Sequence, residues 1–153
     1  MSDRTWLSRT ALLVGEQGID KLSAAKVLVV GLGGVGSYCA EFIARSGVGQ
    51  MTIVDGDVVD PSNRNRQLPA LATTHGMSKA DLMAERLLQI NPDLKLRSEK
   101  TFLRPDAIRA ILSEPYDYVV DAIDSLTPKV TLLSTAYERG LQAGKQHGGR
   151  REV

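Results

Sequence analysis

Cysteine is nearly absent from the sequence, since Cys39 is the single example among 153 residues. One cysteine excludes a disulfide within the chain and a zinc site built from several cysteines. A long apolar run is absent as well: the longest such stretch, residues 26–44, contains four glycines and Glu41. That composition is typical of a strand, a loop and a helix rather than of a membrane span. The first residues also lack the basic and then apolar order of a signal peptide, so we expect a cytoplasmic protein without a membrane segment.

Neither sign of charge dominates, because the net charge is only +1. The average charge therefore does not indicate a nucleic-acid partner, although it leaves room for a local basic patch. A chain of 153 residues, 42% hydrophobic and 24% charged, is long enough for one globular domain and too short for two of ordinary size.

Short apolar runs alternate with amphipathic segments along most of the chain. We expect strands at residues 26–30, 51–54, 94–97 and 118–120, and helices at residues 6–22 (one or two short ones), 35–45, 78–90, 105–112 and 128–139. This alternation predicts a doubly wound, Rossmann-like α/β fold. In that fold the first strand is central, the second and third lie on one side of it, and the fourth lies on the other. The helix at 35–45 is expected to bury Val35, Cys39, Phe42 and Ile43 on one face.

The alternating pattern stops after Gly140. Residues 142–153 are rich in glycine and basic residues and poor in apolar ones, so we expect a domain over residues 1–141 followed by a disordered tail. The fourth strand is then expected to lie at an edge of the sheet.

Four glycines between the first strand and the next helix carry the first functional signal: Gly31, Gly33, Gly34 and Gly36. Glycines at this spacing permit a tight turn and let backbone N–H groups approach a phosphate at the helix N-terminus. Asp55 ends the second strand, where a carboxylate can accept hydrogen bonds from ribose hydroxyls. Together they predict a nucleotide site, although such a loop can also serve only helix–sheet packing.

The polar residues after Asp55 favour ATP over NAD. Residues 62–67 include two arginines, and guanidinium groups can bind phosphate oxygens and stabilise the charge of departing pyrophosphate. Lys79 lies in the first turn of the next helix, and Asp124, just past the fourth strand, could hold Mg²⁺. Taken singly, Arg66 and Lys79 could be surface charges and Asp124 could cap a helix. One site for ATP and Mg²⁺ accounts for all of them at once.

Taken in order, these motifs resemble the ThiF/MoeB/HesA superfamily of ubiquitin-activating-type adenylyltransferases. The resemblance covers residues 6–141. It lies in the glycine loop, Asp-Gly-Asp at 55–57, Ser-Asn-x-x-Arg-Gln at 62–67, Lys79 and Asp-Ala-Ile-Asp-Ser at 121–125. Residues 15–17, 62–70, 90–92 and 121–129 are most similar to the branch of tRNA threonylcarbamoyladenosine dehydratases.

The resemblance implies a role for each matching residue. It places Asp55 on the ribose and Mg²⁺ on Asp124, and it groups Asp57 with the residues that bind the nucleotide. Those implied around the phosphates are Asn63, Arg66, Gln67 and Lys79. Arg9 looks like an arginine that the family donates across a homodimer interface to the partner's triphosphate, so Arg66, Lys79 and Arg9 are the expected catalytic residues.

The implied activity is ATP-dependent adenylation of a carboxylate, here the threonyl carboxylate of a modified adenosine in tRNA, followed by ring closure. Cys39 is expected to be a core residue, since this chemistry needs no covalent enzyme intermediate. Because family members continue past residue 141, the resemblance also implies a C-terminally truncated member. Three alternatives stay open: an activating enzyme for a ubiquitin-like sulfur-carrier protein, an inactive nucleotide-binding fragment, and an NAD(P)-dependent oxidoreductase.

Overall fold

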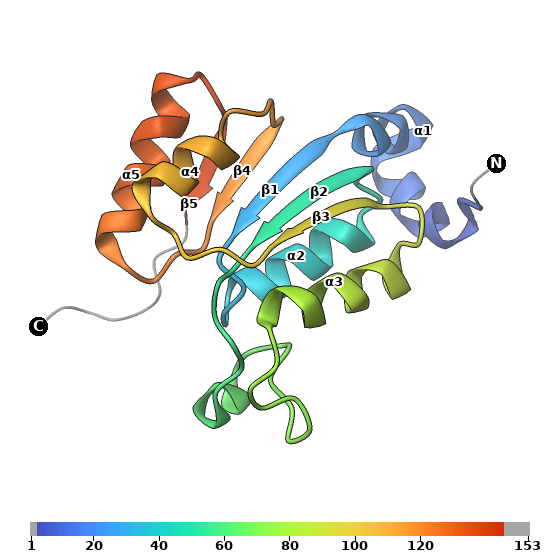
Figure 1. Ribbon diagram of the computed structural model, residues 1–153. Helices are drawn as coiled ribbons and strands as arrows, with labels where there is room; N and C mark the ends of the chain where they lie inside the picture. Colours follow the sequence, from blue (N-terminus) through green and yellow to red (C-terminus); the bar gives the residue numbers. More distant parts are fainter. Residues whose placement is uncertain (1–2, 146–153) are drawn as a thin grey trace, which may run out of the picture.

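A parallel five-stranded sheet forms the centre of the computed structural model, which describes residues 3–145. Its strands are β1 (Lys26–Val30), β2 (Gln50–Val54), β3 (Lys95–Glu99), β4 (Tyr118–Asp121) and β5 (Ala143–Lys145). They lie in the order β3-β2-β1-β4-β5 (Figure 1). The doubly wound fold and the central position of the first strand are therefore confirmed.

Helices α2 (Gly36–Arg45) and α3 (Lys79–Ile90) cover one face of this sheet, and α4 (Pro105–Ile111) and α5 (Leu126–Glu138) cover the other (Figure 1). Helix α1 (Ser8–Ala24) precedes β1, and two short 3-10 helices are η1 (Thr5–Leu7) and η2 (Pro61–Asn65). One core cluster joins α2 and α3 to one face, and a second joins α4 and α5 to the other. Helix α1 is kinked at Gly15, where φ is +74°. The kink divides it into the two short helices that the sequence allowed.

The buried face of α2 agrees with the expected one only in part, since Cys39 and Ile43 pack against the core and the other two residues do not. Phe42 is 67% exposed and Val35 is also exposed, whereas Ala40 and Ala44 are fully buried. The helix approaches the sheet so closely that a Cβ on its first residue, Gly36, would overlap a backbone carbonyl of the glycine loop. Small side chains therefore face the sheet, and the larger apolar ones lie outside.

Cys39 packs at the margin of the core on this helix. Its side chain is partly buried, and burial raises the pKa of the thiol above its ordinary value. Both observations agree with a structural residue rather than a reactive thiolate.

Regular secondary structure extends past the expected boundary at residue 141. Strand β5 pairs with β4 in parallel, and the Val119 N–H donates to the Gln142 carbonyl at 2.8 Å. Strand β4 is thus an internal strand, and the expectations of an edge strand and of a tail beginning at residue 142 are wrong for this segment. Residues 146–153, the remainder of the expected tail, lie outside the described residues.

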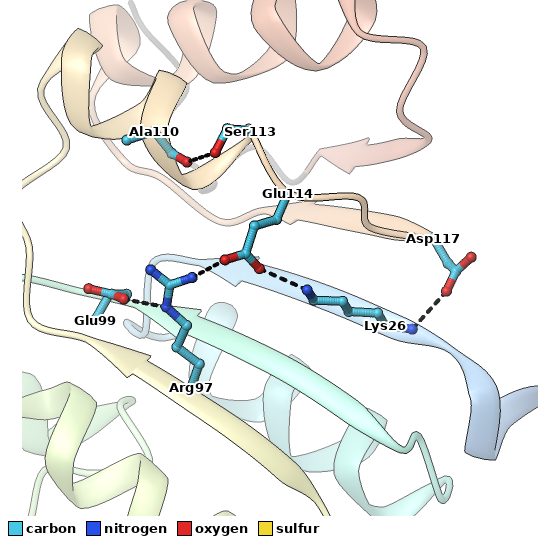
Figure 2. A network of polar contacts seen from close by, with 7 residues as sticks. All are labelled: Lys26, Arg97, Glu99, Ala110, Ser113, Glu114 and Asp117. Carbon is cyan, nitrogen blue, oxygen red and sulfur yellow. Dashed lines mark hydrogen bonds and ion pairs between the residues drawn. The ribbon is translucent and has the colours of Figure 1, made fainter.

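A polar network crosses the sheet on the side of α4 (Figure 2). Glu114 accepts from Lys26 at 2.8 Å and pairs with Arg97, which also donates to Glu99 at 2.5 Å. The hydrogen bond from Lys26 is the main reason why the pKa of Glu114 lies below its ordinary value. The hydrogen bond to Glu99 likewise raises the pKa of Arg97. The network ties β1 and β3 to the segment before β4.

Within residues 3–145 no helix has both the length and the apolarity that a membrane crossing requires. The cytoplasmic location stays a prediction.

Candidate functional site

The predicted site residues, apart from Arg9, lie toward the carboxyl ends of β1, β2 and β4, and parallel strands bring these ends to one edge of the sheet (Figure 1). The chain reverses its direction of winding between β1 and β4. Open α/β sheets bind ligands outside the carboxyl ends of the strands at such a switch point. The topology alone therefore marks this edge as the binding region.

The glycines of the loop divide into two pairs with different surroundings. Gly31 has φ of +94°, and a Cβ there would lie 2.5 Å from the Ala122 carbonyl oxygen, so Gly31 and Gly36 serve close packing. Gly33 and Gly34 instead leave room for an ordinary van der Waals contact. A Cβ at Gly33 would lie 3.5 Å from Nε2 of Gln67, and one at Gly34 would lie 3.5 Å from Cγ of Arg66. The loop thus faces two of the residues predicted to bind phosphate.

Asp55 joins the glycine loop to the segment that follows β2. Its carboxylate accepts the N–H of Leu32 through Oδ2 and the N–H of Asp57 through Oδ1, both at 2.8 Å. The side chain is buried, so these hydrogen bonds hold both loops in place. Each carboxylate oxygen can accept a second hydrogen bond, which leaves capacity for a ribose hydroxyl. Asp57 is exposed, and its carbonyl accepts the N–H of Lys79 at 3.1 Å.

Helix η2 positions the predicted phosphate ligands through a reciprocal cap. Asp60 accepts from Ser62 N–H, while Asn63 Oδ1 accepts from Asp60 N–H at 2.9 Å. The oxygen of Asn63 is therefore engaged in structure, and its amide N–H groups remain for a ligand. Arg66 is exposed and donates to Asn65 Oδ1 at 2.8 Å.

Two buried residues in this region have polar side-chain groups that form no hydrogen bond within the described part of the chain. Gln67 is 7% exposed, and its Oε1 has no hydrogen-bond partner there. Lys79 is 6% exposed as a residue, and its ammonium forms no hydrogen bond or ion pair with any residue from 3 to 145. The pKa of Asp60 is lowered mainly by hydrogen bonds from Ser62 and to a smaller extent by the charge of Lys79, so Asp60 is within electrostatic reach of that ammonium. A phosphate would supply hydrogen-bond acceptors for the Lys79 ammonium.

Asp124 is exposed just past β4, at the same edge of the sheet. No group of three or more His, Cys, Asp or Glu side chains in residues 3–145 could hold a metal ion. Mg²⁺ is commonly bound by one or two carboxylates together with phosphates, so a site at Asp124 requires a phosphate ligand to complete it. The metal role of Asp124 stays a prediction.

Arg9 is not brought to the site by its own chain. It is exposed on α1, which lies near the amino end of β1, whereas the glycine loop follows the carboxyl end (Figure 1). A role for Arg9 at the phosphates therefore requires a second copy of the chain.

A family model described as the ThiF family matches residues 7–144. The chain belongs to the ThiF family. It is 45% identical over 125 residues to the tRNA threonylcarbamoyladenosine dehydratase of Escherichia coli (strain K12). The aligned residues cover 82% of this chain and 47% of the relative. It is 41% identical over 134 residues to the Bacillus subtilis (strain 168) protein of the same name, covering 88% and 53%. The chain thus spans about half the length of these curated relatives.

The fold also matches a solved member of the ThiF family. The crystal structure of E. coli tRNA N6-threonylcarbamoyladenosine dehydratase in complex with ATP superimposes with a TM-score of 0.94 at 39% identity. The match covers 99% of this chain and 63% of that one. The Rossmann-like architecture of residues 3–145 is therefore shared with that structure.

One ion pair of this ThiF-family site escaped the sequence analysis. Lys129 donates to Asp121 Oδ2 at 2.6 Å, and both side chains are buried. The sequence contains the two residues, but a lysine in the first turns of a helix is usually solvated. Nothing in the sequence indicated that the side chain of Lys129 is buried.

Proposed function

We propose that the chain forms the ATP-binding part of an enzyme that adenylates a carboxylate, most specifically a tRNA threonylcarbamoyladenosine dehydratase. The observation that carries the proposal is the glycine loop, whose Gly33 and Gly34 face Gln67 and Arg66. Lys79 adds a cation that forms no hydrogen bond or ion pair through its side chain within residues 3–145. The ATP complex of the E. coli relative supports ATP as the ligand.

In this proposal, different residues bind different parts of the nucleotide. Asp55 binds the ribose hydroxyls, and the backbone at Gly33 and Gly34 approaches the phosphates at the N-terminus of α2. The amide groups of Asn63 and Gln67 and the cations of Arg66 and Lys79 bind phosphate oxygens. ATP would supply the adenylyl group that activates the carboxylate, with pyrophosphate as the leaving group. Arg66 and Lys79 stabilise the negative charge that develops as pyrophosphate leaves.

Mg²⁺ belongs to the proposal as well, with Asp124 as its protein ligand. The exposed carboxylate at the edge of the sheet fits a hard cation, and phosphate oxygens would supply the other ligands.

A homodimer that donates Arg9 to the partner's site is the third part of the proposal. Leu12 and Leu13 are 80% and 86% exposed, and residues three and four positions after Arg9 share its side of the helix. Exposed apolar residues beside the arginine support a protein interface there. Sedimentation of Leu13→Glu should show weaker self-association than wild type, and Arg9→Ala should weaken ATP binding only in the associated state. This part of the proposal would be contradicted if wild type is monomeric and Arg9→Ala binds ATP as tightly as wild type does.

The tRNA substrate is tested by ATP–pyrophosphate exchange. Exchange should require tRNA that carries threonylcarbamoyladenosine, and Arg66→Ala should lower its rate roughly 10²-fold, the scale for loss of one transition-state charge partner. Exchange driven instead by a ubiquitin-like protein would assign the sulfur-carrier alternative. A rate within about threefold of wild type would remove Arg66 from the site.

A further inference from the structure

The buried pair of Asp121 and Lys129 spans the turn that leads from β4 into α5. Asp121 is the last residue of β4 and is fully buried, and the side chain of Lys129 on α5 is 9% exposed. Their contact is 2.6 Å long. The other oxygen of Asp121 accepts the N–H of Ile123 at 3.0 Å, and the N–H of Lys129 donates to the Ser125 carbonyl at 3.2 Å.

These contacts hold the turn at both of its ends. The carboxylate of Asp121 fixes its start through Ile123, and the first turn of α5 fixes its end through Ser125. The Lys129 side chain then connects the two ends by reaching back to Asp121. Asp124 lies between them and is exposed. Its backbone position is therefore set by the pair, while its carboxylate stays available.

The same turn packs directly against the glycine loop. The Ala122 N–H donates to the Val30 carbonyl at 2.9 Å, and the Ala122 carbonyl oxygen occupies the place that a side chain at Gly31 would need. A Cβ at Gly36 would lie 3.0 Å from the Cβ of Ala122. A displacement of the turn would therefore reach Gly31 and the start of α2.

A stable core does not require an ion pair at this place. Removing two charges from water is costly, and apolar residues of similar volume are often at least as stabilising as a buried pair. The pair lies at the switch point of the sheet and orders a turn that touches the ligand-binding loop. Its position thus favours a role in the site over one in packing alone.

We infer that Asp121 and Lys129 are positioning residues of the nucleotide site, which hold the 122–125 turn so that Asp124 and the glycine loop receive ATP and Mg²⁺ together. Neither side chain needs to touch the nucleotide for this. The inference rests on the proposed ATP site and adds to it two residues that act through the turn.

The test uses the whole chain with four variants of the pair. Lys129→Met and Asp121→Asn each remove one charge, and the double variant Asp121→Asn/Lys129→Met removes both without leaving a buried charge unpaired. Lys129→Arg keeps the cation and should rescue. The matched control is Glu41→Gln/Arg86→Met, which removes an ion pair between α2 and α3, away from the turn, whose carboxylate is buried and whose arginine is partly exposed.

Two readouts are measured on samples that circular dichroism shows to be folded. Calorimetric titration with ATP, with and without Mg²⁺, should give roughly ten- to a hundredfold weaker binding for the double variant in Mg²⁺, the scale for loss of a residue that orients a metal ligand. Lys129→Arg and the control should bind within about threefold of wild type. Amide hydrogen exchange without ligand should be faster at Gly31, Ala122 and Ile123 in the double variant only.

The outcomes separate this inference from the proposed function. If wild type binds ATP and the double variant binds it equally well, the pair has only a structural role and the inference is overturned. If wild type does not bind ATP, the proposed function fails. Amide hydrogen exchange at Gly31 and Ile123 then still decides whether the pair positions the turn. Unchanged amide exchange at these residues in the double variant overturns that claim too.

Discussion

At the scale of single residues, two glycines of one loop differ in how much room surrounds them. A Cβ at Gly36 would overlap the Gly31 carbonyl, whereas a Cβ at Gly34 would make an ordinary contact with Arg66. We expect Gly36→Ala to lower the free energy of unfolding by roughly 3 kcal/mol or more, since the backbone of the loop must move. Gly34→Ala should change it by less than about 1 kcal/mol. Urea unfolding of both variants checks this, and equal losses would contradict the geometry.

The charge of Lys79 should matter for ligand binding more than for folding. Lys79→Met removes a cation that forms no hydrogen bond or ion pair among residues 3–145, so the free energy of unfolding should change by less than about 1 kcal/mol. ATP binding should fall roughly tenfold or more, as expected for the loss of a charge-assisted hydrogen bond. Lys21→Met, at an exposed position of α1, is the matched control and should alter neither quantity. Lower stability with unchanged ATP binding would show that Lys79 has a structural role instead.

Several residue roles could be predicted from the sequence because chemistry and spacing specify them. The placement of the glycines, Asp55 and Lys79 at one edge of the sheet is of this kind. The bracing of two loops by Asp55 and the burial of Lys129 could not be predicted, because both depend on which backbone groups lie nearby in space. Whether these residues bind nucleotide stays a prediction.

At the scale of elements, sequence patterns located the strands better than the faces of the helices. The run at residues 26–30 coincides with β1, because a strand buried on both sides is apolar throughout. On α2 the apolar pattern predicted the buried face only in part, because Cys39 and Ile43 pack against the core whereas Val35 and Phe42 are exposed. The close approach of Gly36 to the loop selects alanines against the sheet and leaves Phe42 outside.

Strand β5 was missed for a different physical reason. It has three residues, Ala143, Gly144 and Lys145, with neither alternation nor β-branched side chains. Its formation follows from the unpaired edge of β4 rather than from its own composition.

The network over β1 and β3 gives a prediction about pH. The pKa of Glu114 is lowered in the folded state, mainly by the hydrogen bond from Lys26. The stabilisation that Glu114 contributes is therefore fully present above the pKa of glutamate in the unfolded chain, about 4.3. It is lost as the pH falls through the lower pKa of Glu114 in the folded state. Urea unfolding between neutral pH and pH 3 should show a smaller acid-induced loss for Glu114→Gln than for wild type. Equal losses would mean that Glu114 is not held by its partners.

At the scale of the whole molecule, the order of the strands was predictable and the details of the site were not. Alternating strands and helices with short connections permit few parallel topologies, and the right-handed crossover rule selects among them. The strand order then brings the ends of β1, β2 and β4 together. Membership of the ThiF family extends this agreement to residues 7–144.

The most direct test of the account compares ATP with NAD as ligands of the whole chain. A glycine loop at a β–α turn suits either nucleotide, but the two cations that follow β2, Arg66 and Lys79, suit a triphosphate. Calorimetric titration of wild type with each ligand in Mg²⁺, and of Lys79→Met with ATP, measures the preference and its cause. The account predicts tighter binding of ATP than of NAD in wild type and loss of that preference in Lys79→Met. Tighter binding of NAD, or an ATP affinity that Lys79→Met leaves unchanged, would contradict it.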